Sequence, residues 1–139
     1  MNKLKLGIVG TNFVSDWLAE AAAITDEVDV VSVYSRTHEK GSAFCKKHGI
    51  PTLYTDFEEF LSSDIDGVYI ASPNFMHCPQ TLASISHGKH VLCEKPIASN
   101  SEEYKQMRKA AEKAGVILLE AMRPAFDPAL EAALTSKIQ

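Results

Sequence analysis

The chain has 139 residues, of which 45% are hydrophobic and 23% charged, and its formal net charge is −4. This composition is typical of one soluble globular domain. The negative balance, with no Lys/Arg block longer than two residues, gives no support for binding to nucleic acid or to an anionic membrane. No apolar run approaches the length of a membrane span, so we expect a cytoplasmic protein.

The three cysteines do not form a CxxC pair or a Cys/His cluster. Neither a zinc site nor a disulfide framework is therefore predicted, and we expect no metal. Cys78 and Cys93 are interpreted as packed, reduced thiols.

Short apolar runs alternate with helical stripes along the chain. Strands are predicted at 4–9, 28–34, 52–54, 67–71, 90–93 and 116–119. Helices are predicted at 13–23, at 38–48, in a short segment from 57, at 77–87, at 101–114 and after Asp127-Pro128. Trp17, Phe57, Phe60 and Leu61 are assigned to the core.

This alternation of strands and helices predicts an α/β fold with a parallel sheet covered by helices on both faces. Right-handed crossovers between the strands favour a doubly wound sheet of order 3-2-1-4-5-6, a Rossmann fold in a single domain. In such a sheet, ligands bind at the carboxyl ends of the strands, where the strand order reverses.

The turn after the first strand contains Gly10, Thr11, Asn12 and Phe13, which we predict to bind a dinucleotide. Of the GxGxxG fingerprint only Gly10 is kept, while Asn12 and Ser15 occupy the second and third positions. Asparagine visits left-handed conformations, so Asn12 is expected to make the turn. The free N–H groups of the following helix suit a pyrophosphate, although a plain βα turn is the alternative.

The residues after the second strand indicate whether the cofactor's ribose carries a 2′-hydroxyl or a 2′-phosphate. About twenty residues after the turn, where NAD-binding proteins carry a carboxylate, this chain has Ser35 and Arg36, with Lys40 nearby. A hydroxyl, a guanidinium and an ammonium suit a 2′-phosphate, which favours NADP over NAD. The alternative is that Arg36 is a solvated loop residue.

Two longer segments carry a family resemblance. Residues 88–96, GKHVLCEKP, closely resemble the GKHVxxEKP segment of the glucose–fructose oxidoreductase/inositol dehydrogenase/MocA family (Gfo/Idh/MocA). Residues 66–74 with His77 resemble its DxVxIxxPNxxH segment, and the similarity runs from Leu4 to about Pro128. The resemblance implies an oxidoreductase that transfers a hydride between a nicotinamide cofactor and the CH–OH group of a sugar-like or polyol-like substrate.

The resemblance also implies roles for matching residues. The nicotinamide-ribose side would be lined by Ser72, Pro73, Asn74 and His77. Glu94 and Lys95 would lie at the nicotinamide and substrate, and Arg123 would border the active site. Lys95, paired with Glu94, would be the catalytic residue that hydrogen-bonds the reacting oxygen.

Two of these assignments have alternatives, and a third residue, Glu120, is left open. The Lys95–Glu94 pair is otherwise a structural ion pair, and His77 is otherwise a cap or packing residue. Glu120 is either a neighbour of the catalytic group or a solvated strand end.

By the same resemblance, residues 1–123 form the dinucleotide-binding domain, and 124–139 begin the linker and helix toward a C-terminal α/β domain that is absent here. The full-length form would be a homo-oligomer. We expect the 139-residue chain to bind NADP(H) but to turn over substrate poorly. Two alternatives are a nucleotide-binding regulator or scaffold without catalysis, and an interaction module that binds no nucleotide.

Overall fold

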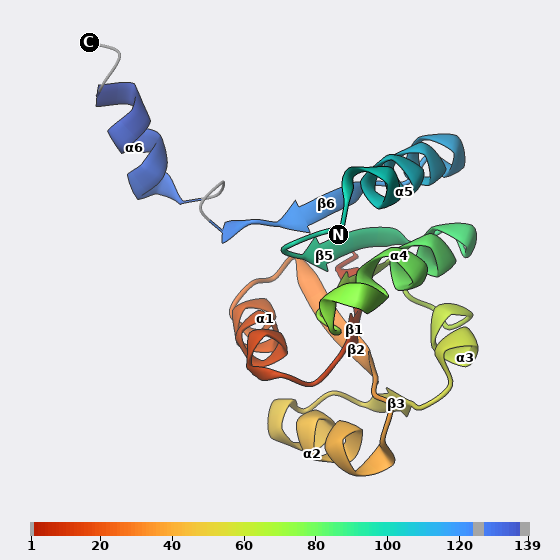
Figure 1. The fold of residues 1–139 in the computed structure, drawn as a ribbon. Coiled ribbons are helices and arrows are strands. Elements are labelled where there is room, and N and C mark those ends of the chain that lie inside the picture. The colour runs from red at the N-terminus through yellow and green to blue at the C-terminus, as the bar shows by residue number, and fades with distance from the viewer. Residues whose placement is uncertain (1, 124–126, 137–139) are drawn as a thin grey trace.

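The computed structural model of the protein describes residues 2–123 and 127–136 (Figure 1). The strands are β1 (Leu4–Val9), β2 (Val28–Tyr34), β3 (Thr52–Tyr54), β4 (Gly67–Ile70), β5 (His90–Glu94) and β6 (Leu118–Ala121). The helices are α1 (Phe13–Ala23), α2 (His38–His48), α3 (Phe57–Leu61), the 3-10 turn η1 (Asn74–Met76), α4 (His77–Ser86), α5 (Ser101–Ala114) and α6 (Pro128–Ser136). Within these residues, no helix has both the length and the apolarity needed to cross a lipid bilayer.

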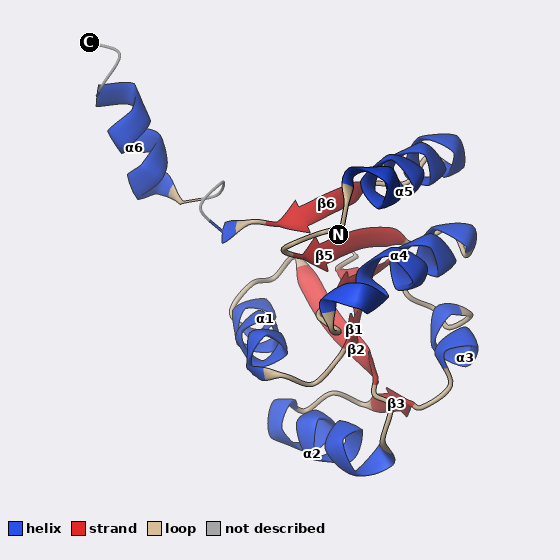
Figure 2. Ribbon diagram, viewed as in Figure 1, coloured by secondary structure: helices blue, strands red, loops and turns tan. Residues whose placement is uncertain are grey.

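The strands form one parallel sheet of order β3-β2-β1-β4-β5-β6, which confirms the predicted doubly wound order (Figure 2). The chain leaves β1 toward one edge, through β2 and β3, and returns to pair β4 on the other side of β1. The strand order therefore reverses between β1 and β4. Their carboxyl ends are the place where this fold leaves room for a ligand.

Polar side chains and glycines set the helix ends, as the sequence predicts. Asp56 accepts a hydrogen bond from the Glu59 N–H at the start of α3, and Gly49 ends α2 in the left-handed conformation. The last strand lies later than predicted, at Leu118–Ala121 instead of 116–119. The reason is that the Val116 N–H still bonds to the Ala111 carbonyl and so completes the C-terminal cap of α5.

Successive residues of each strand point to opposite faces of the sheet and build two cores. Val9, Ile70 and Cys93 pack with α3, α4 and α5 on one face. Ile8 and Val33 pack with α1 and α2 on the other. Both faces of β1 are buried because it lies at the centre of the sheet.

The helical cover of the second face is incomplete. Among the described elements, α1 and α2 pack on β1, β2 and β3, whereas Leu119 of β6 points to the same face and is 50% exposed. Helices thus cover both faces, as predicted, but the second face is left uncovered at the β5–β6 end. Figure 1 draws α6 apart from the layered body, beyond this uncovered end.

The contribution of the first core to stability can be tested at Phe60. It is fully buried and contacts the rings of Tyr34, Tyr54 and Phe57. We expect Phe60→Ala to lower the free energy of unfolding by about 3–5 kcal/mol, because it removes an aromatic ring and leaves a cavity. Urea denaturation measures the change. The control Phe75→Ala, at a side chain that is 68% exposed, should stay within about 0.5 kcal/mol of the parent.

Candidate functional site

Two hollows lie side by side at the carboxyl edge of the sheet, and they share Asn12, Ala71 and Ser72. The first, of about 620 Å³, we call the arginine hollow; it is lined by Gly10, Thr11, Asn12, Asp16, Tyr34, Ser35, Arg36, Thr37, Lys40, Ala43, Phe44, Lys47, Ala71, Ser72 and Pro73. The second, of about 520 Å³, we call the lysine hollow; it is lined by Asn12, Phe13, Val14, Trp17, Ala71, Ser72, Asn74, His77, Glu94, Lys95, Ala121, Met122 and Arg123. Every residue predicted from the sequence to bind cofactor lines one or both of these hollows.

The turn between β1 and α1 lies between the two hollows and contributes residues to both. Gly10 has φ +102°, and a Cβ atom on it would lie 3.0 Å from the Ala71 carbonyl oxygen. Any other residue would be strained there in both conformation and contact. The turn thus depends on Gly10.

Asn12 is not in the left-handed conformation predicted for it. Its φ and ψ are −80° and 179°, and it is the N-cap of α1. Its Oδ1 accepts from the N–H groups of Val14 and Ser15, and its Nδ2 donates to the Ala71 carbonyl at 2.6 Å. The prediction was wrong because Gly10 already supplies the positive φ, so Asn12 is free to cap the helix and to join the β1–α1 turn to β4.

The cap leaves a short row of backbone donors facing outward. Among the described residues, the N–H groups of Thr11, Asn12 and Phe13 have no hydrogen-bond acceptor, whereas Asn12 itself uses those of Val14 and Ser15. Unpaired donors at a helix N-terminus form a binding place for an anion. The side chain of Ser15 is fully buried, as its place in the fingerprint predicts.

The arginine hollow carries positive charge from Arg36, Lys40 and Lys47. The one acidic side chain in its lining, Asp16, is paired with Lys47 at 3.1 Å and with His48 at 2.6 Å. The hydrogen bond from His48, with help from Lys47, lowers the pKa of the Asp16 carboxyl. The charge of Asp16 is therefore balanced by groups of α2.

Ser35 lines the arginine hollow from the β2–α2 turn. It is buried, and its hydroxyl donates to the Thr37 carbonyl at 2.8 Å within the β2–α2 turn. Its proton is thus used to shape the turn that presents Arg36.

In the lysine hollow, Glu94 does not pair with the Lys95 ammonium group in the part of the chain that the structure describes. Its carboxylate instead accepts from the Tyr69 hydroxyl at 2.5 Å and from the Lys95 backbone N–H at 3.3 Å. Burial, followed by the hydrogen bond to Glu94, raises the pKa of Tyr69, so the phenol keeps its proton and donates it. The expected Lys–Glu pair is replaced because Tyr69 reaches the carboxylate from the neighbouring strand.

His77 lies beneath the floor of the lysine hollow and is only 1% exposed. Its Nδ1 lies 2.8 Å from the Pro96 carbonyl oxygen and its Nε2 2.9 Å from that of Ser72. Both ring nitrogens therefore lie within hydrogen-bond distance of backbone carbonyl oxygens, and a neutral imidazole, which has one N–H, donates to one of them. The burial of the ring agrees with the alternative that His77 is a packing residue. The Ser72 hydroxyl is likewise used, as a donor to the Gln80 side chain.

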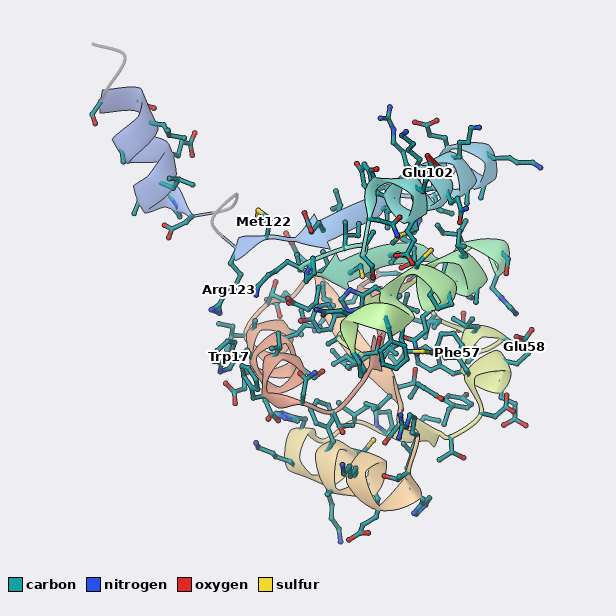
Figure 3. All side chains as sticks on the ribbon, in the orientation of Figure 1. Trp17, Phe57, Glu58, Glu102, Met122 and Arg123 are labelled. Carbon is teal, nitrogen blue, oxygen red and sulfur yellow. The ribbon has the colours of Figure 1, made fainter. Side chains whose placement is uncertain are left out.

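Trp17 is not a core residue, which corrects the prediction. It is 48% exposed and lines the lysine hollow. Figure 3 shows it on α1, below Arg123. The guanidinium carbon of Arg123 lies 4.7 Å from its ring centroid, and Phe13 packs edge-on at 5.2 Å. The prediction rested on the apolar periodicity of the helix, which places Trp17 on its apolar face. The sequence does not reveal that no described helix covers the sheet beside this residue. Phe60 and Leu61 are fully buried, as predicted.

Glu120 binds the backbone of a neighbouring loop. Its Oε2 accepts from the Ile97 N–H at 2.9 Å, so it holds the loop that follows Lys95-Pro96. No motif in the sequence pointed to this contact or to that between Tyr69 and Glu94.

The cysteines take no part in the site's chemistry. Burial raises the pKa of the Cys93 thiol to about 12 and also raises that of Cys78, which keeps both protonated. All three cysteines are free. Across residues 2–123 and 127–136 there is no group of three or more His, Cys, Asp or Glu side chains placed to hold a metal ion.

A doubly wound sheet with a glycine turn and open hollows at its switch point defines the Rossmann class of dinucleotide-binding domains. Comparison with known proteins narrows the class. Residues 4–122 match the Gfo/Idh/MocA oxidoreductase family, described as an NAD-binding Rossmann fold. The chain belongs to the Gfo/Idh/MocA family, as the two sequence motifs predicted.

The chain is similar to characterised relatives over most of its length. It is 44% identical over 126 residues to scyllo-inositol 2-dehydrogenase (NADP(+)) IolU of Bacillus subtilis (strain 168), an alignment that covers 90% of the chain and 38% of the relative. It is 35% identical over 131 residues to D-xylose 1-dehydrogenase (NADP(+)) 2 of Haloferax volcanii, an alignment that covers 94% of the chain and 40% of that relative. The chain thus spans about two fifths of the length of these relatives.

Solved structures share the fold. An NAD-binding oxidoreductase from Klebsiella pneumoniae matches with a TM-score of 0.88 at 28% identity, covering 95% of this chain and 37% of that one. Scyllo-inositol dehydrogenase of Lactobacillus casei, solved with NAD(H) and scyllo-inositol, matches with a TM-score of 0.87 at 24% identity, covering 95% and 40%.

The pairing of Asp16 with α2 predicts a pH-dependent contribution to stability. We expect Asp16→Asn to lower the free energy of unfolding at neutral pH, because charge-assisted hydrogen bonds to His48 and Lys47 are weakened. The folded-state pKa of Asp16 is depressed, so this contribution is present above the unfolded-state pKa and is lost as the pH falls through the folded-state value.

The difference between Asp16→Asn and the parent should therefore begin to shrink below about pH 4 and close only below the depressed folded-state pKa of Asp16. Urea denaturation over a series of pH values measures it. Glu20→Gln, an exposed change on the same helix, is the control and should show no such difference. A gap that stays constant down to low pH contradicts the role of the carboxylate.

Proposed function

We propose that the chain is the cofactor domain of an NADP(H)-dependent oxidoreductase that acts on the CH–OH group of a sugar-like or polyol-like substrate. One observation carries the proposal: the cationic arginine hollow, the free N–H groups at the start of α1 and the lysine hollow follow one another along the sheet edge. A dinucleotide has the same order of parts, with a phosphorylated ribose, a pyrophosphate and a nicotinamide.

The preference for NADP rests on the groups at the end of β2. Arg36 and Lys40 line the arginine hollow, and no Asp or Glu follows β2 directly to bind a free ribose 2′-hydroxyl. A guanidinium binds phosphate oxygens in a forked geometry. The relatives from B. subtilis and H. volcanii are named as NADP(+) enzymes, which supports the same choice.

Lys95 is proposed as the catalytic residue. When bound, the nicotinamide supplies or accepts the hydride. The exposed Lys95 side chain lines the hollow opposite the α1 turn and would hydrogen-bond the substrate oxygen, stabilising negative charge as it develops. Glu94, held by Tyr69, keeps a carboxylate beside the same space. Asn74, Pro73 and Ser72 would contact the nicotinamide-ribose part.

The wider assignments are proposals by similarity. We infer that residues 1–123 form the cofactor domain and that 124–139 lead toward a substrate-binding domain; residues 124–126 and 137–139 lie outside the described part. The full-length form would be a cytoplasmic homo-oligomer, and its substrate would be a polyol or sugar, as for the relatives of these names.

Removing the guanidinium tests the choice of cofactor. We expect Arg36→Ala to weaken NADPH binding roughly 10- to 100-fold, since a hydrogen bond to a charged group is worth about 1.5–3 kcal/mol. NADH binding should hardly change. Fluorescence titration or calorimetry measures both affinities, and Lys46→Ala, on the solvent side of α2, is the control. Unchanged NADPH affinity in Arg36→Ala rules out the 2′-phosphate assignment.

The glycine turn gives a second test. We expect Gly10→Ala to weaken NADPH binding by at least about tenfold, because strain of about 1–3 kcal/mol and the contact with Ala71 displace the turn that carries the free N–H groups. Gly49→Ala is matched to it, since Gly49 also has a positive φ but its added Cβ would meet nothing within 4 Å. That variant should lose stability and keep its NADPH affinity. Equal affinities for both variants contradict the assignment of the turn.

A further inference from the structure

One peptide group beyond Lys95 is held at both of its polar ends. His77 Nδ1 lies 2.8 Å from the Pro96 carbonyl oxygen, and the Ile97 N–H donates to Glu120 Oε2 at 2.9 Å. This carbonyl and this N–H belong to the same Pro96–Ile97 peptide. With the ring proton on His77 Nδ1, two side chains from separate elements, α4 and β6, hold the two polar ends of one peptide plane.

The two side chains are themselves firmly placed. His77 is 1% exposed, and its second ring nitrogen lies 2.9 Å from the Ser72 carbonyl oxygen at the end of β4. Glu120 comes from β6, where Cys93 is its register partner, so it points to the face of the sheet that α5 covers. It lines neither the arginine hollow nor the lysine hollow. Glu120 thus acts on the site only through the loop.

The Lys95 side chain needs such support. It is exposed, and within the described residues its ammonium group has no ion-pair partner that would set its direction. Its direction therefore follows from its backbone. Pro96 restricts the chain on one side of this backbone, and the held Pro96–Ile97 peptide fixes how the loop continues.

We propose that Glu120 and His77 are positioning residues that together orient Lys95 by clamping the Pro96–Ile97 peptide from opposite ends. The inference deepens the proposed function, because it rests on Lys95 facing the nicotinamide. It adds two residues that need not touch cofactor or substrate. It also gives Glu120, which no sequence motif explained, a specific role.

Amide exchange tests the clamp without any cofactor. In Glu120→Ala, the Ile97 amide should exchange about tenfold faster than in the parent, because its acceptor is lost. Glu120→Gln keeps a carbonyl acceptor and should restore the rate to within about threefold. The control Glu112→Ala removes an α5 carboxylate that lines, with Glu120, a hollow between α5 and β6. Among the described side chains Glu112 bonds Arg108, so this variant should leave the Ile97 rate unchanged. An unchanged rate in Glu120→Ala overturns the clamp.

A double variant tests whether the two residues act on one peptide. His77→Leu, which has no donor for the Pro96 carbonyl, should also speed exchange of the Ile97 amide. Combined with Glu120→Ala, it should add little to the larger single effect, since neighbours acting on one group are not additive. Full additivity overturns the shared clamp. If His77→Leu does not fold, the comparison of Glu120→Ala with Glu120→Gln decides.

Shielding of Lys95 connects the clamp to the site. NADPH should slow the reductive methylation of Lys95 in the parent and in Glu120→Gln. In Glu120→Ala the factor by which NADPH slows this reaction should be smaller by about threefold or more. Affinity for adenosine 2′,5′-bisphosphate, which reaches only the arginine hollow, should be equal in all three proteins. Equal shielding in Glu120→Ala overturns the link to Lys95. A parent that does not bind NADPH refutes the proposed function instead, while the exchange experiment still decides on the clamp.

Discussion

The side chain of Asn12 is the contact on which the site depends. Its Oδ1 caps α1 and its Nδ2 donates to the Ala71 carbonyl at the end of β4. The residue thus joins the two strands between which the strand order reverses, where this fold leaves space for a ligand. Gly10 makes this approach possible, because any larger residue would meet the same Ala71 carbonyl.

Charge along the sheet edge is arranged around this junction. Asp16 is the acidic group in the lining of the arginine hollow, and its pairing with Lys47 and His48 leaves Arg36 and Lys40 to determine the local field. At the other end Glu94 is held by Tyr69, away from the Lys95 ammonium group. Among the described residues, an anionic ligand would therefore meet unpaired donors and cations on one side and the unpaired Lys95 ammonium group on the other.

The uncovered part of the sheet bears on the role of this domain. Trp17, Leu119 and Met122 are all more than two fifths exposed on or beside the face that α1 and α2 leave open. Apolar side chains gathered at the mouth of a hollow are typical of a surface that binds a ligand or another protein segment. The matched part is only about two fifths of the length of the relatives, so in them further chain is present that could contact such a surface.

The sequence by itself determined the strand order, the helix ends, the family and the residues gathered at the sheet edge. Each of these depends on local pattern: apolar runs, capping residues such as Asp56, glycines that take a positive φ, and short motifs. The tertiary structure alone decided which side chains meet across elements. Asn12 reaches β4, Tyr69 displaces Lys95 as the partner of Glu94, and Glu120 holds Ile97. Such contacts join residues 23–59 positions apart in the sequence. They therefore follow from the pairing of strands in the sheet and not from any spacing along the chain.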